Sequence, residues 1–323
     1  MAINRSTKSV GILGIGHYLP GEPVTNEAVA ATAGVDIEWI SSRTGIQSRH
    51  YAPPEMQTSD LATEAARRAI EAAPAGLPPD LIVLGTGSPD SPAPATASYV
   101  QDNLGLPGVP AFDVNSSCSG FLSALASATG MFSAGIVARP VVIGADTFSR
   151  CIDPADRKTA PLFGDGAAAV QLGEVPDGYG ILALDLWADG SKAEYAHTPE
   201  HGGYFRMNGR GVKNVVMEMG PKLLNSALAK AGVRLEQLNR ILVHQANPKL
   251  VTWLGESMGV DSDVMPTYGR FTGNTATSSA PLALSLAHEE RPFRDGDLLA
   301  VLSVGAGMSA GAAVVRWYEP KDS

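Results

Sequence analysis

Two helical segments built almost entirely from small residues constrain the fold more than any other feature of this chain. CSGFLSALASATG begins at Cys118, NTATSSAPLALSL begins at Asn274, and an apolar segment of strand-like composition comes before each of them. A helix that is small on every side packs best when other elements enclose it, so we place both segments at the centre of the molecule. The chain therefore reads as two loosely similar halves fused around a pair of central helices.

The surrounding segments alternate between apolar strands and Ala-rich helices, which is typical of an α/β protein with largely buried strands. No linker rich in proline, serine or charge separates the halves, so they are expected to form one fused body. We expect an N-terminal half over residues 1–175, which holds Cys118. A C-terminal half over residues 176–323 is expected to hold His244 and Asn274.

Length and composition limit the classes of function. The 323 residues are 44% apolar and 18% charged, as in a globular protein with a substantial core, and no stretch approaches the length of a membrane span. The N-terminal VGILGIG lacks the long apolar region and cleavage site of a signal peptide. Two cysteines do not make a disulfide framework, which favours the reducing cytoplasm, and the net charge of −9 argues against nonspecific nucleic-acid binding.

Three short motifs suggest chemistry that their surroundings do not support. GILGIGHYL has Gly14 and Gly16 of a dinucleotide-binding fingerprint, but a leucine takes the third glycine position and a proline follows it. HTPEH, His197–His201, has the letters of a metallopeptidase site, but its internal proline opposes the helix that such a site requires. GMSAG, Gly307–Gly311, resembles a hydrolase nucleophile elbow, yet a strand follows it and no histidine comes later. We therefore expect no metal site and no hydrolase triad.

Cys118, in DVNSSCSGFL, lies at the predicted start of the first central helix. Unpaired backbone N–H groups and the helix dipole at such a position stabilise a thiolate. The small neighbours Ser117, Ser119 and Gly120 leave room for a substrate to approach. A buried, inert thiol is the alternative, and this stretch alone does not decide between the two. Cys151, in SRCIDPADR, has no comparable setting and is expected to be inert.

Two polar clusters in the second half add candidates for the same site. HQAN places His244 and Asn247 just beyond a predicted strand, at the carboxyl end where α/β proteins build their sites. Asn274 lies at the cap of the second central helix. Alone, each has an ordinary structural reading, because lone histidines are often structural and asparagine is a common cap. If the halves are copies, however, pseudo-symmetry brings the two helix N-termini together, and Cys118, His244 and Asn274 converge on one pocket.

At these positions the chain resembles a known family. DVNSSCSGF, HQAN, GNTATSSAP and GAGMSAGAAVVRW, with WISSRTGI and FGDGAAA, resemble the β-ketoacyl-acyl carrier protein synthase III family of the thiolase superfamily, in register over nearly the whole chain. The resemblance implies a homodimer of thiolase-like, five-layered αβαβα subunits, each built from two duplicated βαβαβαββ halves. It also implies that Cys118 is the acyl-accepting nucleophile at the end of a substrate tunnel.

The resemblance assigns roles to further residues. Backbone N–H groups of Cys118 and Ala306 would form the oxyanion hole, and His244 and Asn274 would donate hydrogen bonds to a malonyl thioester oxygen. Acyl-CoA is then a substrate, and no separate cofactor is expected. The residues implied to bind the CoA nucleotide, the pantetheine arm and the acyl group are, in that order, Trp39, Arg43 and Arg157; Met207, Gly209 and Asn247; Ala93 and Phe163.

The chain also departs from the family pattern. Gly211, Val212 and Lys213 stand where the family commonly has Glu-Val-Phe, so the tunnel wall is expected to differ. Of the basic residues that dock an acyl carrier protein, Lys249 matches, but Glu256 lies where a positive charge is expected. A basic patch could be rebuilt from Arg206, Arg210 and Lys213. Ala93 stands where some relatives place a bulky aromatic residue, which predicts a primer larger than acetyl.

These features predict an acyltransferase of the ketoacyl synthase type, which loads an acyl group on Cys118 and condenses it with malonyl-acyl carrier protein to start a fatty-acid or polyketide chain. An alternative keeps the acyl-cysteine step but moves the acyl group to a hydroxyl or amine of a small molecule. A non-catalytic thiolase-like subunit is a third reading, against which the retained Cys118, His244 and Asn274 argue. The sequence leaves the acyl donor, the acceptor and the pathway open.

Overall fold

The computed structural model describes residues 8–74, 78–199 and 203–320, which two central sheets organise. The first sheet has the order β1-β7-β6-β4-β5, with bounds Ser9–Tyr18, Gly166–Val175, Pro140–Asp146, Leu81–Gly85 and Ala111–Val114. The second has the order β11-β12-β13-β8, with bounds Arg240–Val243, Leu298–Gly305, Ser309–Arg316 and Gly180–Ala188. In each sheet the parallel strands pair with one antiparallel strand, β7 in the first sheet and β13 in the second. That strand also pairs with the first strand of its half, β1 or β8. The two sheets therefore repeat one topology.

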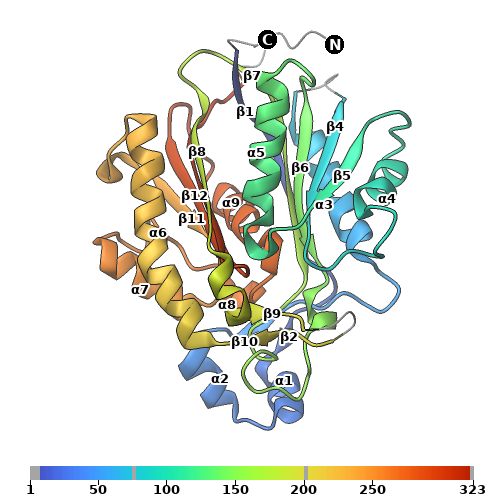
Figure 1. Ribbon diagram of the computed structural model, residues 1–323, viewed down its shortest axis with the longest axis vertical. Helices are drawn as coiled ribbons and strands as arrows, with labels where there is room; N and C mark the ends of the chain where they lie inside the picture. Colours follow the sequence, from blue (N-terminus) through green and yellow to red (C-terminus); the bar gives the residue numbers. More distant parts are fainter. Residues whose placement is uncertain (1–7, 75–77, 200–202, 321–323) are drawn as a thin grey trace.

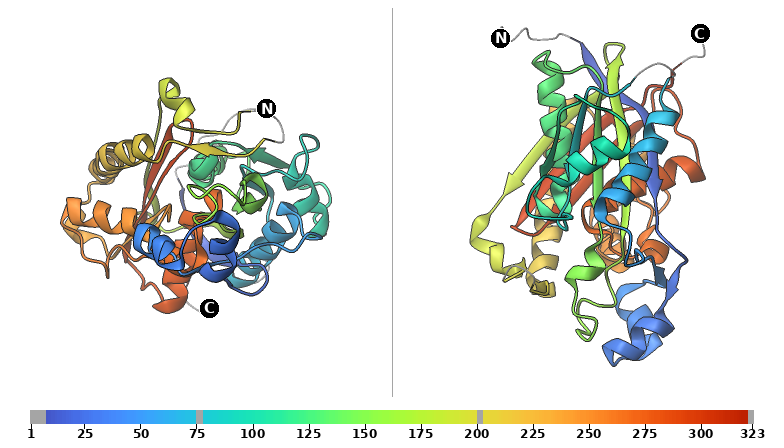
Figure 2. Two further views of the ribbon diagram at one scale, coloured as in Figure 1. Left: turned by 90° about the horizontal axis from the view of Figure 1, so that it is seen from below. Right: turned by 90° about the vertical axis from the view of Figure 1, so that its right-hand side faces the viewer.

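Helices separate and cover these sheets, which gives five layers (Figures 1 and 2). Between the sheets lie α5 (Gly120–Ser133) and α9 (Ser279–Glu290). The outer face of the first sheet is covered by α3 (Thr58–Ala72) and α4 (Thr96–Asn103), and that of the second by α6 (Gly209–Ala231) and α7 (Pro248–Met258). This αβαβα arrangement confirms the predicted fold class.

Close approach explains why the central helices are built from small residues. A Cβ atom at Gly85 in β4 would lie 2.7 Å from the carbonyl carbon of Gly120, at the start of α5. A Cβ atom at Gly144 in β6 would lie 2.8 Å from the carbonyl oxygen of Thr277, just before α9. Larger side chains would push both helix starts away from the sheet. The enclosure that the sequence predicted is therefore confirmed.

The duplication is incomplete at one strand. In the first half, the amide of Ile82 donates to the carbonyl of Pro110 at 2.9 Å, at the entry to β5. In the second half, Ile241 donates to Val264 at 2.7 Å in the same way, but no strand is assigned there within the described residues. The segment reads DSDVMPTY, and aspartate is disfavoured in strands while proline donates no ladder hydrogen bond. The predicted βαβαβαββ pattern thus loses its third strand in the second half.

Shorter elements gather at the lower end of the molecule in Figure 1, near the carboxyl ends of the parallel strands. The helices and strands there are α1 (Asn26–Ala33), α2 (Ile37–Thr44), α8 (Gly269–Thr272), β2 (Val24–Thr25), β3 (Ser48–Arg49), β9 (Ala196–His197) and β10 (Arg206–Met207). The short 3-10 turns of the chain are η1 (Ser117–Ser119), η2 (Phe148–Cys151), η3 (Gly190–Tyr195), η4 (Leu235–Gln237) and η5 (Ala276–Ser278).

The structure accounts for the motifs that were set aside. Gly14 lies within β1, where a Cβ atom would come 2.1 Å from the carbonyl oxygen of Ala69 in α3, so it serves close packing. GMSAG forms the turn into β13 rather than an elbow before a helix. His197 ends β9, while Glu200 and His201 of HTPEH lie outside the described residues. Within the part of the chain that is described, no helix combines the length and hydropathy that a bilayer span requires.

Candidate active site

Cys118 lies on a sharp backbone turn at the start of α5. The preceding Ser117 has φ 49°, in the left-handed region that residues other than glycine rarely adopt. The side-chain oxygen of Asn115 accepts a hydrogen bond from the Ser117 amide at 3.1 Å, which holds the turn. Cys118 then sits in η1, directly before α5. The predicted position of the thiol at a helix start is therefore confirmed.

The same turn recurs in the second half, before α9. Ala276 has φ 49°, and the side-chain oxygen of Asn274 accepts from its amide at 3.0 Å. Asn274 thus corresponds to Asn115, and Thr277 takes the place of Cys118. The two turns meet, because the Thr277 hydroxyl donates to the carbonyl of Ser117 at 3.2 Å. Pseudo-symmetry therefore brings the two helix starts together, as the sequence predicted.

The carboxyl end of β12 supports the Cys118 turn from the other side. The Ser303 hydroxyl donates to the Cys118 carbonyl at 2.6 Å, and a Cβ atom at Gly305 would lie 2.8 Å from the Cys118 amide nitrogen. The backbone N–H of the following residue, Ala306, lowers the pKa of the Cys118 thiol. His244 follows β11, and its amide donates to Leu302 of β12 at 2.8 Å. The end of β12 thus ties together the segments that carry Cys118, Ala306 and His244.

Burial sets the protonation state of the thiol. Desolvation raises the pKa of Cys118 to about 12, against hydrogen bonds from the Ser117 hydroxyl and from the backbone N–H groups of Cys118 and Ala306. The charge of nearby Asp146 raises this pKa as well. The expected thiolate is therefore wrong for the resting site, which holds a neutral thiol. A helix start favours the anion locally, but enclosure by protein costs the anion more.

His244 and Asn274 are both uncharged hydrogen-bonding groups. Desolvation lowers the pKa of His244 to about 4, so its imidazole is neutral at physiological pH. The buried Nδ1 atom of His244 has no hydrogen-bond partner among the described residues. Asn274 uses its carbonyl oxygen for the turn at Ala276, and its amide nitrogen makes no hydrogen bond within the same residues. Each side chain therefore has a ring or amide nitrogen without a hydrogen-bond partner among the described residues, and donation to a substrate oxygen stays a prediction.

Asp146 is a further polar residue of the site that the sequence analysis did not single out. It ends β6 with a fully buried carboxylate. This carboxylate accepts hydrogen bonds from the Gly87 amide at 2.7 Å, the Ser88 hydroxyl at 2.8 Å and the Thr277 amide at 2.7 Å. It therefore links the loop after β4 to the turn before α9. An aspartate at the end of the apolar run PVVIGAD is the signal that marks it.

A cavity of about 850 Å³ opens in front of the Cys118 turn, and we call it the main cavity. Its lining includes Ser117, Ala306, Cys151 and the rings of Phe148 and Phe205. These rings contact the ring of Phe163, and all three belong to a larger hydrophobic cluster against which Cys118 and Cys151 pack. Of the two residues assigned to the acyl pocket, Phe163 belongs to the cluster against which Cys118 packs, and it does not line the main cavity. Ala93 is exposed and does not line the main cavity of its own chain, so its role stays a prediction.

The three residues assigned to the CoA nucleotide lie together. Trp39 and Arg43 on α2, and Arg157 on the loop after η2, line a cavity of about 330 Å³. The Arg157 guanidinium lies 5.2 Å from the centre of the Trp39 ring, a cation–π contact. The structure brings an aromatic surface and two guanidinium groups to one cavity, which suits a purine ring and phosphate groups.

The predicted pantetheine residues have separate settings. Met207, in β10, packs against the cluster that holds Cys118. Gly209 opens α6, with the Met207 methyl group 4.0 Å from the place of a Cβ atom. Asn247 caps α7 by accepting from the Leu250 amide at 2.9 Å, so only its amide nitrogen is left for a ligand. The ordinary cap function and the predicted function of Asn247 are compatible.

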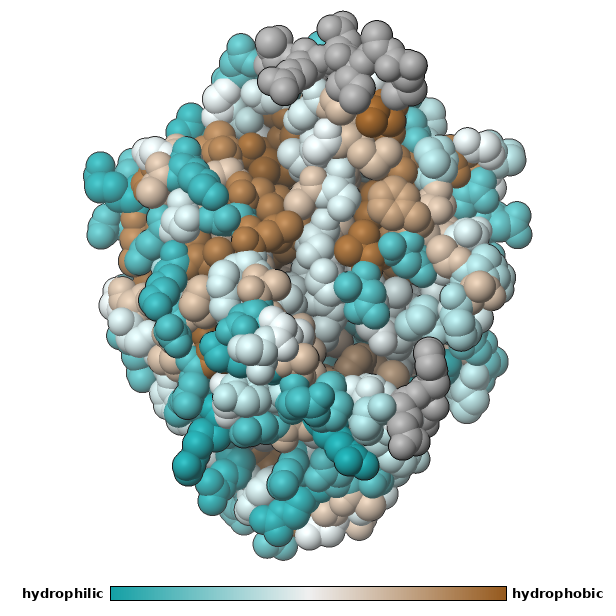
Figure 3. All heavy atoms as spheres, viewed as in Figure 1, coloured by the Kyte–Doolittle hydropathy of each residue, from teal (hydrophilic) through white to brown (hydrophobic). Residues whose placement is uncertain are grey.

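Unpaired cations lie on α6 and α7 near this end of the molecule, where the surface is largely hydrophilic (Figure 3). Within the described residues, Arg210, Lys213 and Lys249 form no ion pair with a carboxylate. The Lys213 ammonium lies 3.8 Å from the centre of the Trp253 ring, which connects the first turn of α6 to α7. Arg210 and Lys213 are exposed and Lys249 is half-buried, and their predicted docking of a carrier protein stays a prediction. Trp253 is an exposed aromatic residue beside Lys213.

Two family models match this chain. The model described as 3-oxoacyl-[acyl-carrier-protein (ACP)] synthase III covers residues 112–190, and the model of the C-terminal part of that synthase covers residues 228–317. The chain belongs to the 3-oxoacyl-[acyl-carrier-protein] synthase III family. The match to the first model contains Cys118, and the match to the second contains His244 and Asn274. The resemblance that the sequence motifs suggested is confirmed.

Curated relatives and solved structures match this chain over nearly its full length. The chain is 41% identical to β-ketoacyl-[acyl-carrier-protein] synthase III of Rhodobacter capsulatus, over 95% of this chain and 98% of that one. It is 38% identical to an acetoacetyl CoA synthase of a Streptomyces species, over 95% and 98%. The fold is shared with the crystal structure of the Aquifex aeolicus synthase III, with a TM-score of 0.92 and 36% identity over 96% of this chain and 100% of that one. It is also shared with the priming β-ketosynthase of the R1128 polyketide pathway, with a TM-score of 0.91 and 28% identity over 99% of each chain.

Proposed function

We propose that this transferase starts fatty-acid or polyketide chains by loading an acyl group from acyl-CoA onto Cys118 and condensing it with a malonyl thioester. The observation that carries the proposal is the meeting of the two backbone turns. One presents a thiol beside the N–H groups of Cys118 and Ala306, and the other presents the free amide donor of Asn274. Names of relatives such as β-ketoacyl-[acyl-carrier-protein] synthase III support the same reaction class.

In the first half-reaction, the Cys118 sulfur attacks the thioester carbonyl of acyl-CoA. The new S–C bond forms as the bond to the CoA sulfur breaks, and the thiol proton ends on the released CoA. The carbonyl oxygen becomes negative in between, and the N–H groups of Cys118 and Ala306, which are close enough to the thiol to lower its pKa, would stabilise it. Trp39 and Arg157 hold the nucleotide of CoA outside the site.

In the second half-reaction, a malonyl thioester takes the place of CoA. Loss of CO2 leaves an enolate, whose oxygen accepts hydrogen bonds from neutral His244 and from Asn274. The carbanion then attacks the acyl carbon, the electron pair of the S–C bond returns to the Cys118 sulfur, and a proton taken up from solvent restores the thiol. The low pKa of His244 suits this role, because a neutral imidazole donates an N–H hydrogen bond to the enolate oxygen but is too weak an acid to protonate the carbanion.

The acceptor is proposed to be a malonyl group on an acyl carrier protein. The exposed cations Arg210 and Lys213 and the half-buried Lys249 suit an acidic partner, although the protein as a whole carries a net charge of −9. The enzyme is further proposed to act as a homodimer, in which the loop that holds Ala93 reaches the acyl pocket of the second subunit. Ala93 is exposed in the single chain, which is compatible with such a contact.

Intact-protein mass spectrometry after exposure to a panel of acyl-CoAs tests the loading step. Wild type and Cys151→Ala are expected to gain one acyl mass, and Cys118→Ala is expected to gain none. Cys151 is the matched control, because it is the second thiol packed against the same hydrophobic cluster. If Cys118→Ala were still acylated while Cys151→Ala was not, the proposed nucleophile would be wrong.

A further inference from the structure

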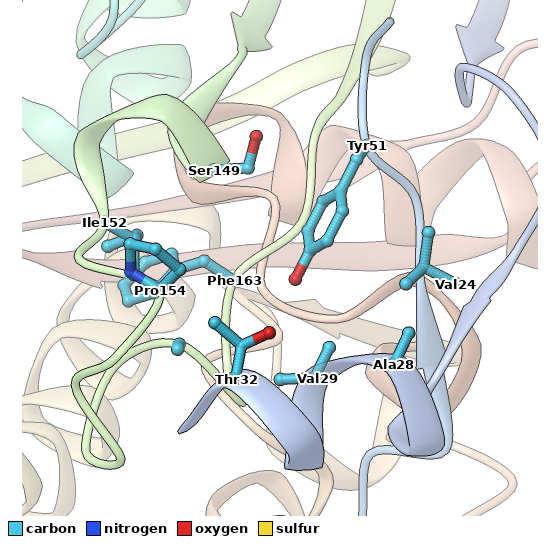
Figure 4. A pocket seen from close by; sticks show the side chains of 10 residues that line it. Val24, Ala28, Val29, Thr32, Tyr51, Ser149, Ile152, Pro154 and Phe163 are labelled. Atoms are coloured by element: carbon cyan, nitrogen blue, oxygen red, sulfur yellow. The ribbon is translucent and has the colours of Figure 1, made fainter. Parts of the chain in front are cut away.

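Two further cavities have similar volumes. The first, of about 250 Å³, lies between α1 and the loop that follows η2, and its lining includes Phe163, which the acyl pocket is already expected to use (Figure 4). The second, of about 240 Å³, lies beside the starts of β11 and β12 and the loop between α9 and β12. We call it the arginine cavity, because Arg240, Arg291 and Arg294 line it. Since β11 and β12 are parallel, it lies at the end of the second sheet opposite to His244.

The three guanidinium groups of the arginine cavity lack carboxylate partners. Within the described residues none of them forms an ion pair, and the one hydrogen bond they donate runs from Nη1 of Arg240 to the carbonyl of Asn239, at 2.7 Å. Asp297 supplies the carboxylate of the lining, and its Oδ2 atom accepts from the backbone amide of Arg294 at 2.9 Å. Three cations and one carboxylate give this cavity a positive charge, on a protein whose net charge is −9.

Hydrogen bonds fix the backbone around the arginine cavity. Asn239 binds both polar backbone groups of Leu298, because its amide donates to the Leu298 carbonyl at 2.7 Å and its side-chain oxygen accepts from the Leu298 amide at 2.8 Å. The loop after α9 closes through the amide of Asp297, which donates to the carbonyl of Arg294 at 2.9 Å. Phe293 anchors this loop with a buried ring. A ligand therefore has to order only the arginine side chains, two of which are exposed to solvent.

The lining indicates which kind of ligand fits. A guanidinium group presents its N–H donors in a planar fork that matches the oxygens of a phosphate. The aromatic residue of the lining, Phe293, is 4% exposed and packs against Trp317, so it offers no face to a nucleobase. The volume lies below the about 300–1,000 Å³ of pockets for drug-sized ligands, which favours a ligand much smaller than CoA. The second carboxylate oxygen of Asp297 accepts no hydrogen bond within the described residues, which suits a ligand hydroxyl.

We propose that the arginine cavity binds a small phosphate monoester that carries a hydroxyl group. The guanidinium groups of Arg240, Arg291 and Arg294 bind the phosphate, and the carboxylate of Asp297 accepts from the hydroxyl. This site is separate from the expected CoA nucleotide site, which a different cavity at Trp39 provides. The inference does not depend on the proposed loading of Cys118.

Isothermal titration calorimetry with glycerol 3-phosphate, at constant ionic strength, measures binding to the full chain. Wild type is expected to bind one molecule per chain. Arg291→Gln and Arg294→Gln are each expected to weaken binding about tenfold or more, as the loss of charge-assisted hydrogen bonds does. Arg291→Lys keeps the charge but loses the planar fork, so it is also expected to bind more weakly than wild type. Arg67→Gln is the matched control, because Arg67 pairs with Glu64 on α3, over the first sheet, and it is expected to bind as wild type does.

Ethyl phosphate, which has no hydroxyl group, tests the part of Asp297. It is expected to bind wild type about tenfold more weakly than glycerol 3-phosphate, and equal affinities would overturn the role of Asp297. If Arg157→Gln abolished binding while the Arg291 and Arg294 variants kept it, the phosphate would lie in the CoA nucleotide cavity and the inference would be wrong. A wild type that binds no glycerol 3-phosphate would overturn the inference as well, and would leave the proposed loading of Cys118 untouched.

Discussion

Cys118 and His244 are both held in their uncharged forms, and burial is the main cause in each case. The pKa of Cys118 is raised to about 12 and that of His244 is lowered to about 4. The resting site therefore contains a thiol and a neutral imidazole rather than a thiolate and an imidazolium. Such a site does not abstract a proton in advance, but stabilises oxygen charge that develops during the reaction. This suits a decarboxylation in which no proton has to be removed from the acceptor.

The low pKa of His244 predicts a loss of stability in acid. Above pH 6.5 the imidazole is neutral in both the folded and unfolded chains. As the pH falls from 7 to 5, the unfolded chain binds a proton at this position, and the folded chain does not do so until about pH 4. The free energy of unfolding should therefore fall by about 2 kcal/mol through this residue alone. Urea titrations at both pH values check this.

The His244→Gln variant isolates that contribution, because other buried histidines such as His17 titrate in both proteins. Its loss of stability between pH 7 and pH 5 is expected to be smaller than that of wild type by about the same 2 kcal/mol. Equal losses in the two proteins would show that His244 is not held in its neutral form by folding.

The two turns before α5 and α9, one from each half of the chain, meet at the candidate active site. Each combines a left-handed residue, an asparagine side chain that holds the turn, and a helix of small residues. The strand β12 fits against the first turn only because Gly305 has no side chain. The position of the thiol therefore depends on backbone contacts between elements from both halves.

Gly305→Ala is expected to damage the site without removing any chemical group. Its methyl carbon would lie 2.8 Å from the Cys118 amide nitrogen and 2.9 Å from that of Ser119, closer than side chains normally approach. We expect acylation by acyl-CoA to slow by a hundredfold or more, on the order of the loss of one oxyanion donor. The rate is measured by intact-protein mass spectrometry.

Gly130→Ala is the control, since Gly130 lies in α5, where a Cβ atom would meet nothing within 4 Å. This variant is expected to be acylated at the wild-type rate and to unfold with about 1 kcal/mol more free energy, because alanine is the better helix former. If Gly305→Ala matched it in acylation rate, the support that β12 gives to the turn would be unimportant.

Sequence patterns predicted the buried strands, the enclosed helices and the positions of Cys118, His244 and Asn274, because these depend on local composition and on motif order. They did not predict φ 49° at Ser117 and Ala276, since a left-handed serine or alanine depends on tertiary support. The protonation state of Cys118 was predicted wrongly for a related reason. The helix start is visible in the sequence, whereas the enclosure of the thiol comes from the second half of the chain.

Charge is distributed unevenly over the protein. The net charge is −9, yet exposed cations without carboxylate partners lie near the cavity that Trp39 and Arg43 line. Repulsion of acidic partners elsewhere and attraction at this end would orient the proposed acyl carrier protein toward the cavity that Trp39 and Arg43 line. The pairing of Lys213 with Trp253 adds an apolar surface to this end.

Lys213→Glu is expected to raise the KM for malonyl-carrier protein about tenfold, because it places a negative charge against an acidic partner. Lys222→Glu is the matched control on the same helix, where Lys222 pairs with Glu218 at 2.9 Å and is exposed. Steady-state kinetics at low ionic strength compare the two variants. Equal effects would place carrier-protein docking elsewhere.

Release of labelled CO2 from malonyl-carrier protein by the acyl-loaded enzyme tests the central claim most directly. We expect wild type to release CO2 and form a new carbon–carbon bond. His244→Ala and Asn274→Ala should still carry the acyl group on Cys118 but release CO2 a hundredfold to a thousandfold more slowly. The contradicting result is an acyl-loaded wild type that releases no CO2 above background. That result would reject condensation and leave transfer of the acyl group to a hydroxyl or amine, with His244 as the base.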